Sequence, residues 1–352
     1  MAPSQADLRA LQDLIATTQT LLTQFSATLT TTETQIEPIE NPPNPLDVLR
    51  DSARLLKAHT TKVSLLAINK PFTPTAITKV LRELSSTCLP AMISASQICS
   101  LQEKTTWGTT MSHELRARIR IVFLEMQNLL RELDSISQGH GAGATNARDS
   151  LSSTGVVWES CDALISLCDM GVAGLAVQKA EQYRDTIKDA IAELQEWKEG
   201  TDLEAEGHGD ELLGSDDEGV DGEERDSLDE IFNAANSMPK DRPELRELVE
   251  VAEGKLKKVV FLYTALSKRR FKGYKDGDVG ILDRVLKGLL SVQNAVDELI
   301  SKFYDLDENG AKEELEKCVS EAKEVAELVA LDWRGKEDEF TGWNKKWEEA
   351  LG

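Results

Sequence analysis

An acidic stretch at residues 201–230 constrains the fold of this chain more than any other feature. It holds fourteen Asp and Glu residues and one basic residue, Arg225, and so carries −13 of the net charge of −22. An acidic sequence without aromatic residues cannot bury enough apolar surface to offset the entropy lost on ordering. We therefore predict a disordered acidic linker between an N-terminal domain, residues 1–200, and a C-terminal domain, residues 231–352.

The two flanking regions are nearly balanced in charge, as folded domains usually are. Residues 1–200 carry 18 basic and 23 acidic side chains, and residues 231–352 carry 21 and 25. An isoelectric point near 4.7 argues against nucleic acid as a partner, because the phosphate backbone attracts clustered Lys and Arg. We also expect no membrane partner, since the longest nearly apolar run, residues 170–177, is far shorter than the ~20 residues that span a bilayer.

Apolar residues recur at alternating spacings of three and four, which predicts long helices packed side by side as in bundles and coiled coils. The first such stripe contains Leu8, Leu11, Ile15, Thr18, Leu22, Phe25, Leu29, Thr32 and Ile36. Further stripes predict helices over residues 46–67, 77–98, 111–136 and 151–197, the last with an interruption at Gly171 and Gly174. Thr73 followed by Pro74 predicts an N-cap and the first residue of the third helix.

Beyond the acidic stretch, the same pattern predicts helices over residues 243–270, 279–304 and 311–330, and a short C-terminal helix. No segment shows strand alternation between hairpin turns. The predicted fold is therefore all-α, with about five helices in the N-terminal bundle and about four in the C-terminal one.

Residues 305–316 fit the spacing of an EF-hand calcium loop. Asp305, Asp307, Asn309 and Glu316 would supply oxygen ligands around the glycine at 310. No second loop accompanies this one. The alternative is a polar turn between two helices, with Asn309 and Gly310 ending the first and acidic side chains favouring the start of the next. The sequence leaves calcium binding open, and we assign no metal ligand.

A basic segment, residues 255–275, has eight positive charges and no negative one: Lys255, Lys257, Lys258, Lys268, Arg269, Arg270, Lys272 and Lys275. Such a pattern is typical of the solvated edge of a core helix. A second interpretation is that the acidic linker docks on this helix and screens it from a partner, in a contact that added salt would weaken.

Two further features have both structural and functional interpretations. Ser215 and Ser227 each precede acidic residues, a pattern that acid-directed kinases favour and that acidic sequence also produces by chance. Phe340, Trp343 and Trp347 share one side of a short helix, where they would anchor the chain to a core or, if exposed, form a partner-binding patch.

Nothing in the sequence assembles a catalytic site or a cofactor site. Histidines occur at 59, 113, 140 and 208, without the spacing of metal ligands, and no phosphate-binding loop is present. Five cysteines, at 88, 99, 161, 168 and 318, form no CxxC pair, so we expect reduced, buried thiols. The protein is predicted not to be an enzyme.

Several segments, in this order, resemble the cyclin-D-binding protein family of helix-loop-helix-like cell-cycle regulators. They are residues 154–164 with Trp158 and Cys161, residues 180–197, the acidic insert, residues 257–259 and residues 282–304. The resemblance covers about the last two-thirds of the chain, and the first third agrees only in helical character. It implies a helical, non-enzymatic protein that binds cyclins or helix-loop-helix transcription regulators in nucleus and cytoplasm.

The sequence thus predicts a protein–protein interaction adaptor that regulates cell-cycle progression. Two other functions remain compatible with it. An acidic escort for basic proteins would use the linker as its binding element. A cytoskeletal linker of the vinculin or talin kind would use the bundles themselves. The oligomeric state is not predicted.

Overall fold

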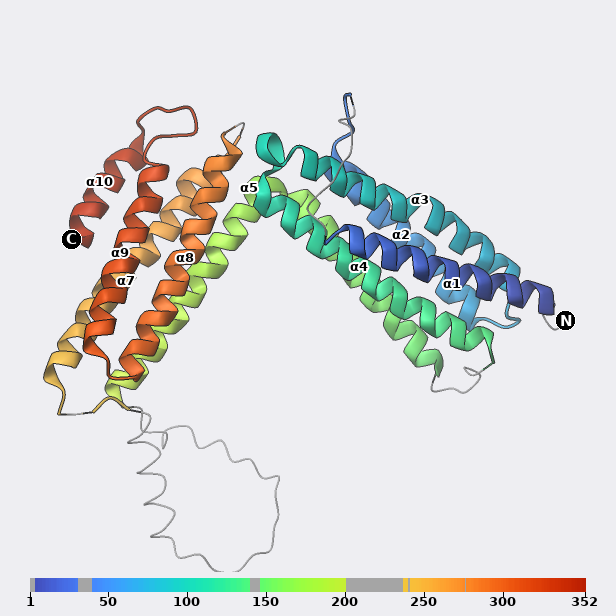
Figure 1. Cartoon of the computed structure of the whole chain (residues 1–352), viewed down its shortest axis with the longest axis horizontal. Coiled ribbons are helices and arrows are strands. Elements are labelled where there is room, and N and C mark those ends of the chain that lie inside the picture. The colour runs from blue at the N-terminus through green and yellow to red at the C-terminus, as the bar shows by residue number, and fades with distance from the viewer. Residues whose placement is uncertain (1–3, 31–39, 140–145, 201–236, 240, 276) are drawn as a thin grey trace, which may run out of the picture. The chain divides into compact units, whose positions relative to one another are not determined.

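The computed structural model describes residues 4–30, 40–139, 146–200, 237–239, 241–275 and 277–352, and gives no account of the side chains of 146–152. These residues form helices and connecting turns and contain no strand, which confirms the predicted all-α class. The chain divides into two compact units, Met1–Leu175 and Ala176–Gly352 (Figure 1). The acidic stretch at 201–230, Thr32 and Ile36 lie outside the described residues.

Unit 1 is a bundle of long helices. Its elements are α1 (Gln5–Thr28), α2 (Pro45–Ile68), α3 (Pro74–Leu101), a π-helix η1 (Glu103–Trp107), α4 (Gly108–Ser137) and the first half of α5 (Asn146–Glu199). The predicted stripes face inward: Leu11, Ile15 and Leu22 of α1 are fully buried, as are Leu115 and Ile119 of α4. Because these side chains repeat with the helical period, each helix presents one apolar face to the shared core.

Local sequence determines where two of these helices begin. The side chain of Asn44 accepts a hydrogen bond from the backbone amide of Leu46 at 2.9 Å, and Pro45 occupies the first helical position of α2. Thr73 and Pro74 occupy the predicted N-cap and first helical positions of α3, but the Thr73 side chain makes no capping bond to the helix. Its hydroxyl instead donates to the carbonyl of Pro71 at 3.0 Å.

The two units are continuous through α5, which is interrupted by non-helical backbone at Gly171 (φ 61°, ψ −168°). This confirms the predicted interruption at that residue. The boundary between the two units lies shortly after Gly171, between Leu175 and Ala176. The sequence instead predicts an N-terminal domain that ends at residue 200. The reason is that the last part of α5 packs in unit 2, where Lys198 forms an ion pair with Glu253 at 2.7 Å.

The segment Ser153–Glu199 of α5 has the length and composition of a membrane-crossing helix. Some of its apolar residues are buried within the protein. Leu164 and Cys161 are buried in the core of unit 1, and Ala180, Ile187 and Leu194 are buried in unit 2. Core helices share this apolar character, so length and composition alone do not assign the segment to a membrane.

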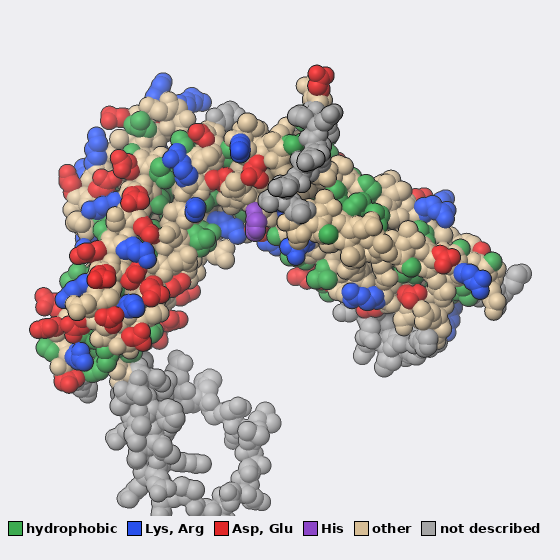
Figure 2. All heavy atoms as spheres, viewed as in Figure 1, with side chains coloured by type: hydrophobic (Ala, Val, Ile, Leu, Met, Phe, Trp, Pro, Cys, Tyr) green, Lys and Arg blue, Asp and Glu red, His purple; other side chains and the backbone are tan. Residues whose placement is uncertain are grey.

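Unit 2 contains the rest of α5 together with α7 (Pro243–Leu266), a π-helix η3 (Ser267–Phe271), α8 (Val279–Tyr304), α9 (Glu308–Leu328) and α10 (Glu339–Leu351). Its core is apolar, with Leu262, Leu289 and Phe303 fully buried. The buried hydroxyl of Tyr263 donates to the carbonyl of Leu289 at 2.6 Å, which ties α7 to α8. On the face drawn in Figure 2, charged side chains of both signs cover much of this unit.

Substitution of Gly171 tests whether its backbone conformation requires glycine. Its φ and ψ lie in a region that only glycine adopts without strain, so Gly171→Ala should lower the free energy of unfolding by ~1–3 kcal/mol. Urea unfolding followed by circular dichroism measures this change.

Gly155→Ala is the matched control on the same helix. A Cβ atom at Gly155 meets nothing within 4 Å, and its backbone is helical. Alanine is the better helix former by about 1 kcal/mol, so this variant should be at least as stable as the parent chain. Equal effects of the two substitutions would contradict the account of Gly171.

Candidate functional site

The C-terminal helix α10 packs against α7 and α9 in unit 2, and a hollow lies along each of its two flanks. The hollow beside α7 has a volume of about 520 Å³ and is mainly apolar. The hollow beside α9 has a volume of about 440 Å³ and is lined mostly by polar side chains. How α10 is held in place therefore decides the geometry of both.

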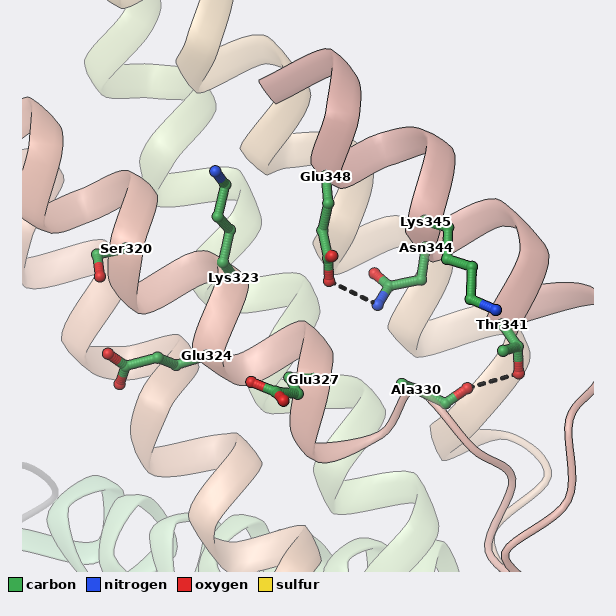
Figure 3. A pocket seen from close by; sticks show the side chains of 9 residues that line it. All are labelled: Ser320, Lys323, Glu324, Glu327, Ala330, Thr341, Asn344, Lys345 and Glu348. Atoms are coloured by element: carbon green, nitrogen blue, oxygen red, sulfur yellow. Dashed lines mark hydrogen bonds between the residues drawn. The ribbon is translucent and has the colours of Figure 1, made fainter. Parts of the chain in front are cut away.

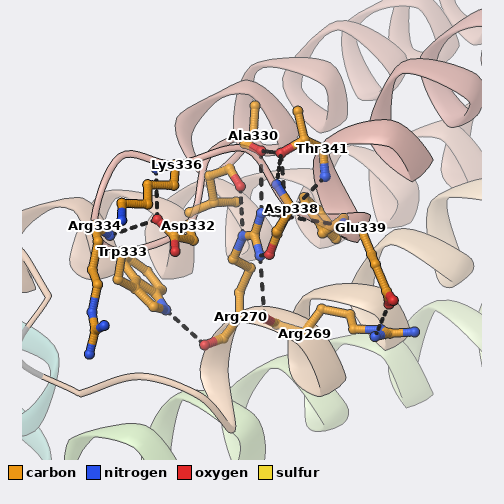
Figure 4. A network of polar contacts seen from close by, with 12 residues as sticks. Arg269, Arg270, Ala330, Asp332, Trp333, Arg334, Lys336, Asp338, Glu339 and Thr341 are labelled. Atoms are coloured by element: carbon orange, nitrogen blue, oxygen red, sulfur yellow. Dashed lines mark hydrogen bonds and ion pairs between the residues drawn. The ribbon is translucent and has the colours of Figure 1, made fainter.

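A buried arginine holds α10 in place. The side chain of Arg270, in the π-helix η3, is 1% exposed and forms a two-pronged pair with Asp338 (Figure 4). Its Nη1 donates to one carboxylate oxygen at 2.7 Å and its Nη2 to the other at 2.9 Å. Nε donates to the carbonyl of Val329 at 2.8 Å, and Nη2 also reaches the carbonyl of Ala330 at 3.2 Å. The guanidinium is thus satisfied by acceptors from the turn between α9 and α10.

Asp338 both pairs with Arg270 and caps the start of α10. Besides pairing with Arg270, its carboxylate accepts hydrogen bonds from the backbone amides of Phe340 and Thr341, both at 3.1 Å, and so caps α10. The hydroxyl of Thr341 accepts from the amide of Asp338, and this bond completes a capping box. The same hydroxyl donates to the carbonyl of Ala330. The bonds from Arg270 and then from the cap outweigh partial burial and lower the pKa of Asp338 to about 2.

The connecting turn is held by its own hydrogen bonds. The carboxylate of Asp332 accepts from the amides of Arg334 and Lys336 at 2.9 and 2.8 Å, and these bonds lower its pKa. The indole of Trp333 donates to the carbonyl of Arg270 at 2.8 Å and packs edge-on against Tyr274. Figure 4 shows the bonds of Asp332 within the turn and the bond from Trp333 to Arg270.

An aromatic ladder runs from this network along α10. The Arg270 guanidinium lies 4.2 Å from the centre of the Phe340 ring, in a cation–π contact. Phe340 lies 5.3 Å from Trp343, and Trp343 stacks on Trp347 at 6.1 Å. The indole of Trp347 donates to the carbonyl of Lys258 at 2.8 Å, which fixes the far end of α10 to α7. The prediction that these aromatics anchor the chain is confirmed for the buried Phe340 and Trp347, whereas Trp343 is only partly buried.

The hollow between α7 and α10, here called the aromatic groove, is formed by eight residues. They are Lys258, Phe261, Thr264, Ala265, Trp343, Lys346, Trp347 and Ala350. Phe261 is 63% exposed, the highest value among the large exposed hydrophobic side chains of the described chain. The only charges on the lining are two lysines, Lys258 and Lys346, and the Nζ of Lys258 donates a hydrogen bond to the carbonyl of Ala350.

The polar hollow between α9 and α10 is shown in Figure 3. Asn344, 3% exposed, donates from Nδ2 to Glu348 at 3.0 Å, and its Oδ1 has no hydrogen-bond partner. Lys323 and Lys345 share the lining with Glu324, Glu327 and Glu348, so charges of both signs are present. This hollow therefore has no dominant charge with which to select a ligand.

The structure favours a helix connection over a calcium loop at residues 305–316. Asp305 caps the end of α8, and the carboxylate of Asp307 caps α9 by accepting from the amide of Gly310 at 2.9 Å. Asn309 and Glu316 lie within α9, so Asn309 and Gly310 open that helix and do not end α8. Throughout the described ranges, no group of three or more His, Cys, Asp or Glu side chains has the geometry to hold a metal ion.

The basic segment is not one solvated edge. Lys257, Lys268, Arg269, Lys272 and Lys275 are exposed, and Lys255 and Lys258 are partly buried. Arg270 is fully buried, so its assignment to a solvated edge is wrong. The sequence does contain a signal that Arg270 is buried. It continues the three-and-four spacing of a buried apolar stripe, which consists of Leu256, Val259, Tyr263 and Leu266. An arginine at a buried position of this kind requires an oppositely charged partner beside it.

The remaining candidate residues bring no further site together. Ser215, Ser227, His140 and His208 lie outside the described residues. All five cysteines are free and buried, and burial raises the pKa of Cys161, Cys168 and Cys318 to about 12. His59 is buried in α2, where loss of solvent lowers its pKa.

These features define an all-α protein whose second unit holds a short helix against the bundle through a buried arginine. Residues 48–200 match the model of the family described as "Grap2 and cyclin-D-interacting, N-terminal". Over this region the chain is similar to the cyclin-D-interacting protein family, and the predicted resemblance is confirmed. The match begins in the first third of the chain, where only helical character was expected to agree with the family. Residues 257–259 and 282–304, which also carry the resemblance, lie after the end of the match at residue 200.

One relative matches both units. It is the "Uncharacterized protein C22E12.18" of Schizosaccharomyces pombe, 27% identical over 319 residues, which cover 89% of this chain and 87% of that protein. The similarity therefore extends past residue 200 into the unit that holds α10.

Two neighbouring arginines provide a test of the Arg270 network. Arg270→Ala leaves the capping carboxylate without its partner and empties a buried position, and should cost about 3–5 kcal/mol in the free energy of unfolding. Arg269→Ala removes an exposed pair with Glu339 at 2.8 Å and should cost less than about 1 kcal/mol. Urea unfolding of both variants measures the difference, and similar losses would refute the role assigned to Arg270.

The pKa of Asp338 gives the pH dependence of this network. A carboxyl group whose pKa is lower in the folded state, here about 2 against ~3.9 when unfolded, stabilises the fold above the unfolded value. This contribution is lost as the pH falls through about 2. The stability difference between the parent chain and Asp338→Asn should thus be constant above about pH 5 and shrink below pH 4. A difference that vanished already between pH 5 and 7 would contradict the assignment.

Proposed function

We propose that this protein is a non-enzymatic adaptor that regulates cell-cycle progression by binding a D-type cyclin or a helix-loop-helix transcription regulator. The observation that carries the proposal is the match of residues 48–200 to the cyclin-D-interacting family. That range runs from α2 to the end of α5, so it includes most of unit 1. The adaptor acts in cytoplasm and nucleus, and its buried thiols suit a reducing compartment.

The surface of the matched region supports this proposal. In the segment that carries the family resemblance, Val157 and Cys161 are buried in the core of unit 1, whereas Trp158 between them is 38% exposed. Exposed tryptophans are enriched where proteins bind each other, because a large rigid side chain buries much area at a small entropic cost. Trp158 is therefore the residue of the family-like segment best placed to contact a partner.

The direct test is titration calorimetry of the full chain with a purified D-type cyclin. We expect micromolar or tighter binding that Trp158→Ala weakens at least tenfold. Leu290→Ala, which removes a similarly exposed apolar side chain from α8 outside the matched region, should leave the affinity unchanged. Absence of cyclin binding by the intact chain would remove the named partner from the proposal.

A deletion of residues 201–230 separates the adaptor from the acidic escort. An adaptor keeps its partner without the acidic stretch, whereas an escort for basic proteins loses the element that carries most of the net negative charge. Affinity purification of the intact and deleted chains, with partners identified by mass spectrometry, distinguishes the two. Co-sedimentation with filaments would instead favour a cytoskeletal linker.

A further inference from the structure

The aromatic groove of unit 2 is suited to bind another protein. Its lining residues lie between positions 258 and 350, so the family match, which ends at residue 200, says nothing about it. Two packed helices, α7 and α10, form its walls, and Trp343 and Trp347 lie along the α10 side. Grooves of this kind, apolar and bordered by charge, are where amphipathic helices dock on helical proteins.

The floor of the groove is rigid before any partner arrives. Trp347 is buried and hydrogen-bonded to the carbonyl of Lys258, and Trp343 stacks on it. The other end of the ladder, Phe340, lies under the guanidinium of Arg270. Because these rings are already ordered, a ligand loses little free energy in arranging them.

Phe261 is the part of the groove left open to solvent. At 63% exposure, its ring projects from α7 beside Ala265 and the α10 tryptophans. Removing exposed apolar surface from water favours binding in proportion to the area covered. A partner that covers Phe261 would therefore gain binding free energy.

The charge of the groove lining indicates which charge its partner carries. In a chain of net charge −22, the lining of this groove carries Lys258 and Lys346 and no acidic side chain. At the neighbouring end of α7, Lys268 and Arg269 add positive charge, and Arg269 is paired with Glu339. On α10, two acidic residues follow Trp347: Glu348, which lines the other hollow, and the exposed Glu349. The positive side chains on the lining thus favour carboxylates.

Dimensions favour a short helix as the occupant. Lys258 to Ala265 spans two turns of α7, about 10 Å at 1.5 Å per residue. An amphipathic helix presents apolar side chains at i, i+3, i+4 and i+7 over this length, and places acidic residues on its flanks. We propose that the aromatic groove binds an acidic amphipathic helix of a partner protein, with apolar side chains against Phe261 and Trp343 and carboxylates at Lys258 and Lys346.

The probe is a fluorescently labelled synthetic helix, with leucines at i, i+3, i+4 and i+7 and glutamates on both flanks. A peptide of the same composition in scrambled order is its control. Fluorescence anisotropy with the full chain should show saturable binding of the helix and at least tenfold weaker binding of the scrambled peptide. The affinity should also fall as salt is raised, because Lys346 is exposed and Lys258 is only partly buried.

Matched variants locate the binding. Phe261→Ser and Lys346→Glu should each weaken it at least fivefold, since both side chains are exposed and their loss leaves the fold intact. Leu290→Ser and Lys287→Glu make the same changes on the exposed face of α8 and should have no effect. Equal losses in the controls, or no binding of the helix at all, would overturn the proposal.

Two other occupants are distinguished by the same assay. If the helix binds only after residues 201–230 are deleted, the groove belongs to the acidic stretch of this chain and the proposal fails. If the full chain is a dimer that Phe261→Ser dissociates, the groove is an interface between copies and the proposal also fails. Binding by the intact monomer, lost in the two groove variants alone, establishes it.

Discussion

The arrangement of unit 2 depends on one interaction, the burial of the Arg270 guanidinium against Asp338. A charged group without solvent is stable only when it is paired and its donors are satisfied, and here the pair also caps α10. A single carboxylate therefore determines both where α10 begins and where it lies. The two hollows beside α10, and the aromatic ladder along it, follow from that placement.

This arrangement explains why a short terminal helix can present a rigid surface. A helix of 13 residues has little stability of its own in water. The cap at Asp338, the cation–π contact with Phe340 and the hydrogen bond from Trp347 hold it at both ends. Trp343 and Phe261 can remain partly or largely exposed because neither is needed to hold α10.

The sequence predicted the fold well because apolar periodicity is a local signal. The stripes of α2, α4 and α8 lie in the core as expected, and the interruption at Gly171 follows from the conformational freedom of glycine. The boundary between units was less accessible, because α5 continues past Gly171 and then packs with α7. Such a partnership is set by contacts between residues far apart in the chain, including Lys198 and Glu253.

The site was harder to predict for the same reason. Counting charge placed Arg270 with its exposed neighbours, although the spacing of its stripe pointed inward, and its partner Asp338 lies 68 residues away. The hollows beside α10 likewise depend on which helices meet. Residues 305–316 show the converse: the spacing of a calcium loop is present, but Asn309 and Glu316 are part of a helix. Spacing predicts ligands only when the backbone between them forms a loop.

Hydrogen–deuterium exchange of the intact chain tests the central role of Arg270 most directly. Peptides from α10 should be protected in the parent chain and should exchange much faster in Arg270→Ala, while peptides from α8 keep their protection in both. Protection of α10 that is unchanged by this substitution would show that something other than the buried arginine holds the helix, and would contradict the account.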